Sequence, residues 1–221
     1  EIEDQEIEGE CELVLGKIEF EAGDKDRGRQ RFARSLVVCR EAGDKRGEAN
    51  ALRWLGKADL ESGDTASAAQ RLGQALHAFR AFEMWEELLG CLEDEASLAR
   101  IEGDTGRAAH LLAAAAMSRD RQHLLRAPRI ERHWQAQVAA LRQVMPDAAF
   151  DPAWEEGRRW EVDQAIDWWK KLQCGKPFFI EEPTSPDDFI GHKAIREGVA
   201  PVKVATCEVC QNRNLFKQMI A

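Results

Sequence analysis

The chain has 221 residues, of which 31 are basic and 40 acidic, giving a formal net charge of −9, and 44% are hydrophobic. This composition suits a globular protein and argues against direct binding to nucleic acid or a membrane surface, which requires an excess of positive charge. The sequence contains no run of about 18 apolar residues, the length needed to cross a bilayer. Residues 1–4 (EIED) lack the basic start of a secretory leader, so we expect a cytoplasmic protein.

The first 127 residues contain a repeat with a period of 40 residues. Three Gly-Asp dipeptides recur at this step: Gly23-Asp24, Gly63-Asp64 and Gly103-Asp104. Three sets of matched positions keep the same register: Gly28, Ala68 and Ala108; Phe32, Leu72 and Leu112; Ser35, Ala75 and Ala115. Glycine can end a helix in the left-handed conformation, and the following aspartate can accept the first amides of the next helix. Because all seven prolines lie at 128 or later, the pattern predicts helices at 8–22, 26–42, 46–62, 66–82, 86–102 and 106–120.

The first two repeats resemble the tetratricopeptide family. Its signature offsets are occupied by Leu55-Gly56, Ala68, Leu72 and Ala75, and the match is repeated by Leu15-Gly16 with Phe32. The third unit departs, because Glu95-Ala96 replaces Leu-Gly. The resemblance implies a mainly α protein in which residues 1–125 form three helical hairpins stacked as a solenoid, a scaffold that holds other proteins.

The 40-residue step is also similar to the repeats in sensor regions of large bacterial ATPase-type transcriptional regulators. Residues 134–166, with Trp134 and the run 153–158 (AWEEGR), look like the closing segment of those regions. We therefore expect residues 126–160 to form a closing helical hairpin. The chain has no GxxxxGK[ST] loop, so nucleotide hydrolysis is not expected of it.

In the tetratricopeptide family the inner face of the first helices lines a concave groove. Carrying the family's offsets across gives six candidate groove residues: Lys17, Phe20, Asn50, Arg53, Lys57 and Arg100. This strip is mildly basic in an acidic protein, so it could dock a peptide or an acidic segment of a partner protein by charge and shape. The alternative is that these charges are ordinary solvated surface. The sequence does not indicate an oligomeric state.

From about Trp160 the pattern changes to short alternating elements. We expect a helix at 161–173, a strand at 177–180, a helix at 189–197, a strand at 202–205 and the start of a helix at 214–221. Such alternation predicts a parallel sheet covered by helices, so residues 161–221 are expected to form a small α/β unit.

Two runs in this tail, 180–188 (IEEPTSPDD) and 210–213 (CQNR), resemble the middle of the enolase-superfamily barrel, and most closely its sugar-acid dehydratases of the L-fuconate type. The resemblance implies a partial TIM barrel and a magnesium ion held by carboxylates at consecutive strand ends, which match Glu181 and Glu208. The alternative is that both carboxylates are inherited without a metal. No other cofactor is expected.

Parts of that active site have no match in the sequence. Glu155 stands in a helical segment where the family has a strand-end aspartate, and Cys207 replaces a glycine before the next metal ligand. The strand with the catalytic lysine and the His-Asp pair are missing, so we expect no carbon–oxygen lyase activity from this chain alone. The six cysteines are expected to be reduced, and Cys207 with Cys210 would need two further ligands to hold zinc. Because the chain opens without methionine, we expect it to be a piece of something longer.

Two hypotheses of function follow. The first is a protein–protein interaction scaffold joined to an inactive barrel fragment, and the second is a fragment of a magnesium-dependent sugar-acid dehydratase. The two families meet near 154–166. This junction also fits a recombined, misassembled or constructed sequence.

Overall fold

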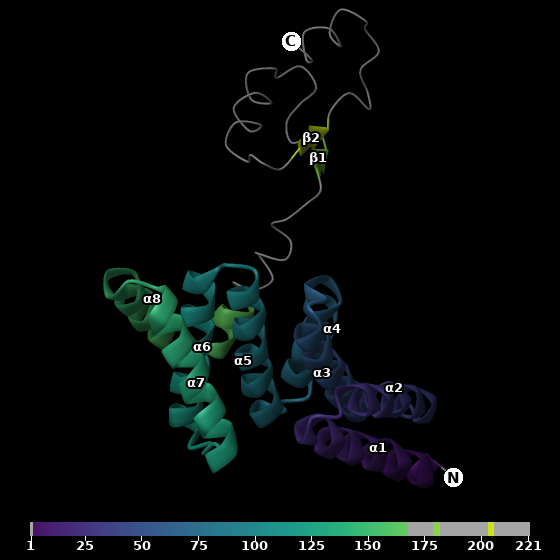
Figure 1. Ribbon diagram of the computed structural model, residues 1–221. Helices are drawn as coiled ribbons and strands as arrows, with labels where there is room; N and C mark the ends of the chain where they lie inside the picture. Colours follow the sequence, from purple (N-terminus) through teal and green to yellow (C-terminus); the bar gives the residue numbers. More distant parts are fainter. Residues whose placement is uncertain (1, 168–178, 182–202, 206–221) are drawn as a thin grey trace, which may run out of the picture. The chain divides into compact units, whose positions relative to one another are not determined.

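The computed structural model describes residues 2–167, 179–181 and 203–205, and its contacts divide the chain into two units, 1–166 and 167–221. The first unit consists of helices (Figure 1): α1 (Ile2–Ala22), α2 (Lys25–Ala42), α3 (Lys45–Ser62), α4 (Thr65–Ala81), α5 (Trp85–Ile101), α6 (Thr105–Gln122), α7 (Pro128–Val144) and α8 (Asp147–Arg159). A further helical stretch covers 162–167. The prediction of a mainly α chain is confirmed, and the first six helices lie where the 40-residue register places them.

The turns between these helices follow from the Gly-Asp dipeptides. Gly63 ends α3 with a φ of 81°, and Asp64 then accepts a hydrogen bond from the amide of Ser67 at 3.0 Å. The same kind of cap precedes α2, α3 and α6, formed by Asp24, Asp44 and Asp104. The turn before α5 lacks this signal, since Glu83 adopts a positive φ of 54° and Met84 provides no side-chain cap. Packing of α5 must therefore compensate for its missing cap.

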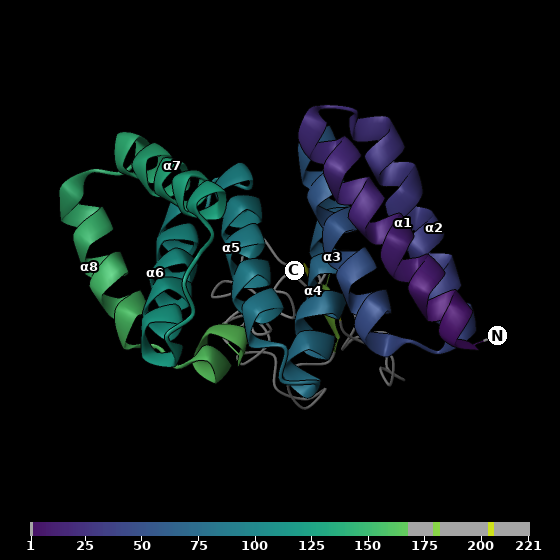
Figure 2. The ribbon, with the colours of Figure 1, turned by 90° about the horizontal axis from the view of Figure 1, so that it is seen from below.

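Consecutive helices pack in pairs, α1 with α2, α3 with α4 and α5 with α6, and Figure 2 shows α1 lying beside α2. Between pairs, α2 packs on α3 and α4 packs on α5, while α1 contacts α3 and α3 contacts α5. The bulky register positions are the centre of these contacts: Phe32 and Leu72 are completely buried and Leu112 is 1% exposed. Small residues make the approach possible, because a Cβ on Gly56 would lie 2.8 Å from Leu72 Cγ. The repeat in the sequence is thus a repeat of core contacts.

The helical unit also contains buried charges that the hydrophobic pattern does not reveal. Asp59 of α3 is fully buried, with Arg29 Nη2 of α2 2.6 Å from its Oδ1 and Arg71 of α4 bonded to its other oxygen. In the third pair, Glu95 occupies the position of Leu55 and accepts a hydrogen bond at 3.4 Å from Arg107, which is 4% exposed. A buried ion pair between Arg107 and Glu95 therefore replaces apolar packing where the third repeat departs from the pattern.

The expected closing hairpin differs in its packing. Helices α7 and α8 form at 126–160 as predicted, but α8 packs mainly against α6, and Figure 2 shows it running beside that helix. In α7 only Leu141 is buried. The close approach of α8 to α6 occurs at Gly157, where a Cβ would lie 2.8 Å from His110 Cα. The second helix of this pair therefore covers the outer side of α6.

Residues 161–166 pack with the helical unit, in agreement with the resemblance of 134–166 to a closing segment. Val162, Ala165 and Ile166 are buried, and Asp163 accepts hydrogen bonds from both Arg80 Nε and Arg80 Nη2 at 2.5 and 2.8 Å. These contacts join residues 161–166 to the helical unit, because the apolar side chains of this segment are buried against it.

Replacing Gly157 with alanine is expected to lower the free energy of unfolding of the helical unit by about 1–3 kcal/mol, because the new Cβ would meet backbone atoms of His110. Gly106→Ala is the matched control, since the nearest atom to its Cβ would be Asp104 Oδ1 at 3.9 Å. Thermal unfolding followed by circular dichroism should show a lower midpoint for Gly157→Ala only. Equal midpoints for the two variants would contradict the close contact.

In the second unit the structure describes two strands, β1 (Phe179–Glu181) and β2 (Lys203–Ala205). They pair in parallel, with Ile180 opposite Val204 and Glu181 opposite Ala205. The two predicted strands therefore form, with β1 shifted toward Glu181. The helices expected at 189–197 and 214–221 lie outside the described residues. Across the described part of the chain, none of the helices has the length and apolarity needed to traverse a bilayer.

Candidate functional site

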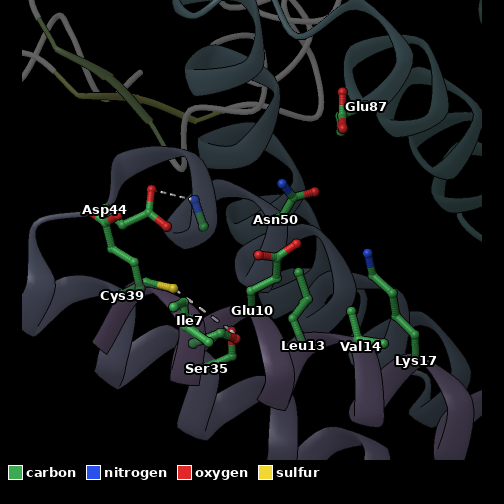
Figure 3. Close-up of a pocket in the computed structure, with 13 residues that line it drawn as sticks. Ile7, Glu10, Leu13, Val14, Lys17, Ser35, Cys39, Asp44, Asn50 and Glu87 are labelled. Atoms are coloured by element: carbon green, nitrogen blue, oxygen red, sulfur yellow. Dashed lines mark hydrogen bonds between the residues drawn. The ribbon is translucent and has the colours of Figure 1, made fainter. Parts of the chain in front are cut away.

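A cavity of about 540 Å³ opens between α1, α3 and α5, with further lining from the end of α2 and the turn that follows it. Figure 3 shows the side chains of α1 along one side of it and Glu87 of α5 across from them. The lining residues are Glu6, Ile7, Gly9, Glu10, Leu13, Val14, Lys17, Ser35, Cys39, Asp44, Gly47, Asn50 and Glu87. Two of the six predicted groove residues, Lys17 and Asn50, belong to this set.

Part of the cavity lining is uncharged. Leu13 is 6% exposed, and Ser35 donates a hydrogen bond from Oγ to the Gly9 carbonyl at 2.8 Å. Cys39 Sγ lies 3.9 Å from the same hydroxyl, and burial raises the pKa of this thiol, so it stays protonated at neutral pH. This part of the lining can therefore contact an aliphatic group without exposing an unpaired charge.

The walls of the cavity carry more negative than positive charge. Four carboxylates line it, those of Glu6, Glu10, Asp44 and Glu87, against the single ammonium group of Lys17. Burial, helped by the charge of Arg53, lowers the pKa of Lys17. Lys17 Nζ lies 5.4 Å from the centre of the Trp54 ring, a cation–π distance. The cavity is thus suited to a cationic group, opposite in sign to the predicted acidic partner.

Two of the predicted basic groove residues are neutralised within the protein. Arg53 donates from Nε to Asp94 Oδ2 at 2.6 Å, and Lys57 Nζ donates to Asp94 Oδ1 at 2.9 Å. Burial opposes the charge of Asp94, but Arg53 and Lys57 outweigh it and hold the pKa of the carboxyl below its usual value. Burial likewise opposes the charge of Arg53, and Asp94 holds the pKa of Arg53 above its usual value. Two of the four basic residues of the expected strip therefore belong to an internal ion-pair cluster.

The other predicted groove residues lie in different environments and do not form one surface. Phe20 is 5% exposed and packs against Phe32 and Trp54, with ring centres 5.8 and 6.2 Å away, so it belongs to the core and not to a docking surface. Asn50 donates from its side-chain amide to the Arg46 carbonyl at 3.3 Å. Arg100 is exposed on α5 and does not line the cavity. The prediction of a single basic groove is corrected, because the family offsets do not report which neighbour each side chain meets.

The residues that give the cavity its negative charge are not among those predicted from the sequence. Glu10 and Glu87 come from the first helices of the first and third pairs, and Asp94 stands 40 residues after Trp54 in the same register. The repeat offers the signal: inner-face positions one register apart face each other across neighbouring first helices. Arg53 and Asp94 are 41 residues apart, so the register brings them to neighbouring positions without predicting their pairing.

The strand edge of the second unit contains one of the two predicted metal ligands. Glu181 is the last residue of β1, opposite Ala205 at the end of β2, so the carboxyl ends of the two parallel strands meet at one edge. Glu208 lies three positions beyond β2, outside the described residues. No group of three or more His, Cys, Asp or Glu side chains in the described part of the chain could hold a metal. The backbone position of Glu181 nevertheless fits a carboxylate ligand at a strand end.

The same strand-bearing part of the chain has known relatives. Residues 113–221 match the family model described as Enolase C-terminal domain-like. The matched span begins inside α6 and includes α7, α8 and both strands. The L-galactonate dehydratase of Hypocrea jecorina is 60% identical over 63 residues, 28% of this chain and 14% of that protein. Mitochondrial enolase superfamily member 1 of Bos taurus is 50% identical over 68 residues, 30% of this chain and 15% of that protein.

A different similarity is found to proteins named as HTH-type transcriptional regulators. The Mycobacterium bovis protein is 36% identical over 103 residues, 47% of this chain and 11% of that protein. This chain thus spans about a seventh or less of the length of the curated relatives it matches. No solved structure matches the chain with comparable significance. The comparisons support sugar-acid dehydratase homology over the C-terminal part more strongly than regulator homology.

Proposed function

We propose that the C-terminal part of the chain is a segment of the β/α barrel of a magnesium-dependent sugar-acid dehydratase, a carbon–oxygen lyase of the enolase superfamily. The observation that carries this proposal is the 60% identity over 63 residues to an L-galactonate dehydratase. The parallel pairing of β1 and β2 supports it, because a β/α barrel is built from parallel strands.

In this proposal Glu181 and Glu208 hold magnesium at the edge where β1 and β2 end. Hard carboxylate oxygens are the ligands that magnesium prefers, and Glu181 occupies a strand end in the structure. A bound magnesium ion would polarise the carboxylate of a sugar-acid substrate. Glu181 and Glu208 bind and orient, while the proton transfers of dehydration require a base and an acid that these two residues do not supply.

Magnesium titration by calorimetry tests the proposed site. The intact chain is expected to give a saturable heat of binding that is lost in Glu181→Gln, which keeps the shape of the side chain but removes its charge. Glu182→Gln is the matched control, because it removes a neighbouring carboxylate from the same sequence run. If neither the unchanged chain nor Glu181→Gln gives a heat of magnesium binding, the metal site is excluded.

A second function is proposed for the helical unit, namely binding of a peptide from a partner protein, because the 540 Å³ cavity opens on the inner side of α1, α3 and α5. Its lining contains the apolar side chains of Ile7, Leu13 and Val14 together with four carboxylates. This combination fits a lysine or arginine side chain of the peptide, which has an aliphatic stem and a charged end. The tetratricopeptide assignment and the solenoid belong to this proposal. They are supported by the 40-residue register and the paired helices.

Charge removal inside the cavity should weaken peptide binding. In fluorescence anisotropy at low salt, a labelled Ala-Arg-Leu-Arg-Ala peptide is expected to bind the intact chain, and the double variant Glu10→Gln/Glu87→Gln to bind about tenfold more weakly. Glu41→Gln is the control, since Glu41 is an exposed carboxylate of α2 that does not line the cavity. Tighter binding of the acidic counterpart Ala-Glu-Leu-Glu-Ala would reverse the sign assigned to the cavity.

A further inference from the structure

Lys17 lines the cavity as a cation without a bonded partner. Within the part of the chain that the structure describes, its ammonium group makes no hydrogen bond and no ion pair. Burial and the charge of Arg53 lower its pKa, and the carboxylates of Glu87, Glu21 and Glu10, none of them bonded to it, offset this lowering only in part. Lys17 is thus a half-buried charge that the fold leaves poorly neutralised.

The 40-residue register explains why Lys17 has no partner. Lys57 occupies in α3 the position that Lys17 occupies in α1, and its Nζ donates to Asp94 of the next first helix, α5, at 2.9 Å. The residue that stands toward Lys17 as Asp94 stands toward Lys57 is Trp54 of α3. Trp54 offers a ring whose centre lies 5.4 Å from Lys17 Nζ, but it has no carboxylate. The comparison involves only α1, α3 and α5, so it does not depend on any residue before α1.

A ligand carboxylate would supply for Lys17 the contact that Asp94 supplies for Lys57. The other charged walls of the cavity require the opposite sign, since Glu10 and Glu87 also make no ion pair among the described residues. A purely acidic ligand would meet these two carboxylates, and a purely basic ligand would leave Lys17 unpaired. A ligand with both charges satisfies both walls.

The spacing of these groups limits how the ligand presents its charges. Glu10 and Lys17 are seven residues apart on one helix, which is about two turns or about 10 Å, and both side chains extend from α1 on the side of the cavity (Figure 3). In an extended peptide, side chains two residues apart lie on the same side at a separation of about 7 Å. Arginine and glutamate side chains are long enough to bridge the difference. A basic and an acidic residue separated by one position therefore fit the cavity.

We propose that the cavity binds an extended segment of a partner protein in which a basic and an acidic residue are separated by one position, with the basic side chain at Glu10 and Glu87 and the acidic side chain at Lys17. Lys17 then determines which basic peptides are preferred. This inference rests on the peptide binding proposed for the helical unit and adds the acidic residue to it. It is independent of magnesium binding at the strand edge.

The test compares two labelled peptides, Ala-Arg-Leu-Glu-Ala and Ala-Arg-Leu-Gln-Ala, by fluorescence anisotropy at low salt. The intact chain is expected to bind the glutamate peptide about fivefold more tightly, because only that peptide pairs with Lys17. Lys17→Met keeps an unbranched side chain without the charge and should bind both peptides equally, whereas Lys17→Arg should restore the preference. Lys25→Met is the control and should keep it, since Lys25 is an exposed lysine of α2 that does not line the cavity.

The reversed pair, Ala-Glu-Leu-Arg-Ala and Ala-Gln-Leu-Arg-Ala, reports the direction in which the peptide lies. A preference for glutamate in either order supports the proposal if it disappears in Lys17→Met. Because the two peptides are first compared on the intact chain, the result is decisive even if Lys17→Met is unstable by circular dichroism.

Two results would overturn the role of Lys17 and leave peptide binding in place. They are equal binding of the glutamate and glutamine peptides to the intact chain in both orders, and a preference for glutamate that persists in Lys17→Met. A different result separates the underlying function. If no peptide binds the intact chain, Ala-Arg-Leu-Arg-Ala included, peptide binding in the cavity is wrong and this inference fails with it.

Discussion

Asp94→Ala is expected to lower the free energy of unfolding of the helical unit by about 3 kcal/mol, because it removes a buried carboxylate and leaves two partly buried cations without their shared partner. Arg53 Nε and Lys57 Nζ lie 2.6 and 2.9 Å from the two carboxylate oxygens of Asp94, which is 5% exposed. Urea unfolding followed by circular dichroism measures the change. Glu41→Ala, which removes an exposed carboxylate of α2, is expected to change it by less than about 0.5 kcal/mol.

The same cluster predicts a dependence on pH. Arg53 and Lys57 hold the pKa of Asp94 below its unfolded value of 3.8, so its contribution to stability is complete above that value and is lost as pH falls through the folded pKa. The difference in stability between the intact chain and Asp94→Ala should therefore be constant near pH 7 and shrink below about pH 4. A difference that grows on acidification would contradict the ion-pair assignment.

Phe32→Ala is expected to cost about 3–5 kcal/mol of unfolding free energy, because it opens a cavity where α1, α2 and α3 meet. Phe32 is completely buried, and its ring centre lies 5.8 Å from that of Phe20 and 5.4 Å from that of Trp54. Its edge also fills the space that the missing side chain of Gly16 leaves open. The loss should appear as a lower midpoint in urea without a change in the helical signal at zero denaturant.

Val37→Ala provides the matched control for Phe32→Ala. Val37 lies on the same helix but is 53% exposed, so its truncation removes little buried surface and is expected to change stability by less than about 0.5 kcal/mol. Comparable losses in the two variants would show that position on α2, and not burial at the repeat register, determines the effect.

The helices were predictable because their signals are local and repeated. The Gly-Asp turns and the matched positions of Phe32 and Leu72 are read from the sequence by spacing alone, and they locate both the helix ends and the core. The packing of α8 on α6 was not predictable in this way. It depends on the absence of a side chain at Gly157, and one glycine in an exposed-looking segment carries no directional signal.

The candidate site was predicted less well, because its character depends on contacts between helices. Family offsets located Lys17 at the cavity but assigned Phe20 to it as well, although that ring faces the core. They also counted Arg53 as a free positive charge. A residue's position on a helix gives its face, whereas its effective charge depends on the neighbour it meets, here Asp94 from the next pair.

In the tail, strand propensity and the resemblance to the enolase barrel predicted two strands, and parallel pairing followed from the alternation of elements. The carboxyl-end position of Glu181 was predictable for the same reason. The exact end of the helical unit was left open between 154 and 166, and in the structure the side chains of Ala165 and Ile166 are buried in this unit. Burial at a junction depends on both segments that meet there, so composition does not mark it.

Amide hydrogen exchange of the intact chain, measured with and without magnesium, tests the proposed strand-edge site most directly. Magnesium is expected to slow exchange both in the peptide that contains residues 179–181 and in the peptide that contains residues 203–205, since one ion would hold the ends of both strands. Glu181→Gln should abolish this protection, whereas Glu182→Gln should keep it. Exchange that is unchanged by magnesium in both strands, or slowed equally in Glu181→Gln, would contradict a metal site at this edge.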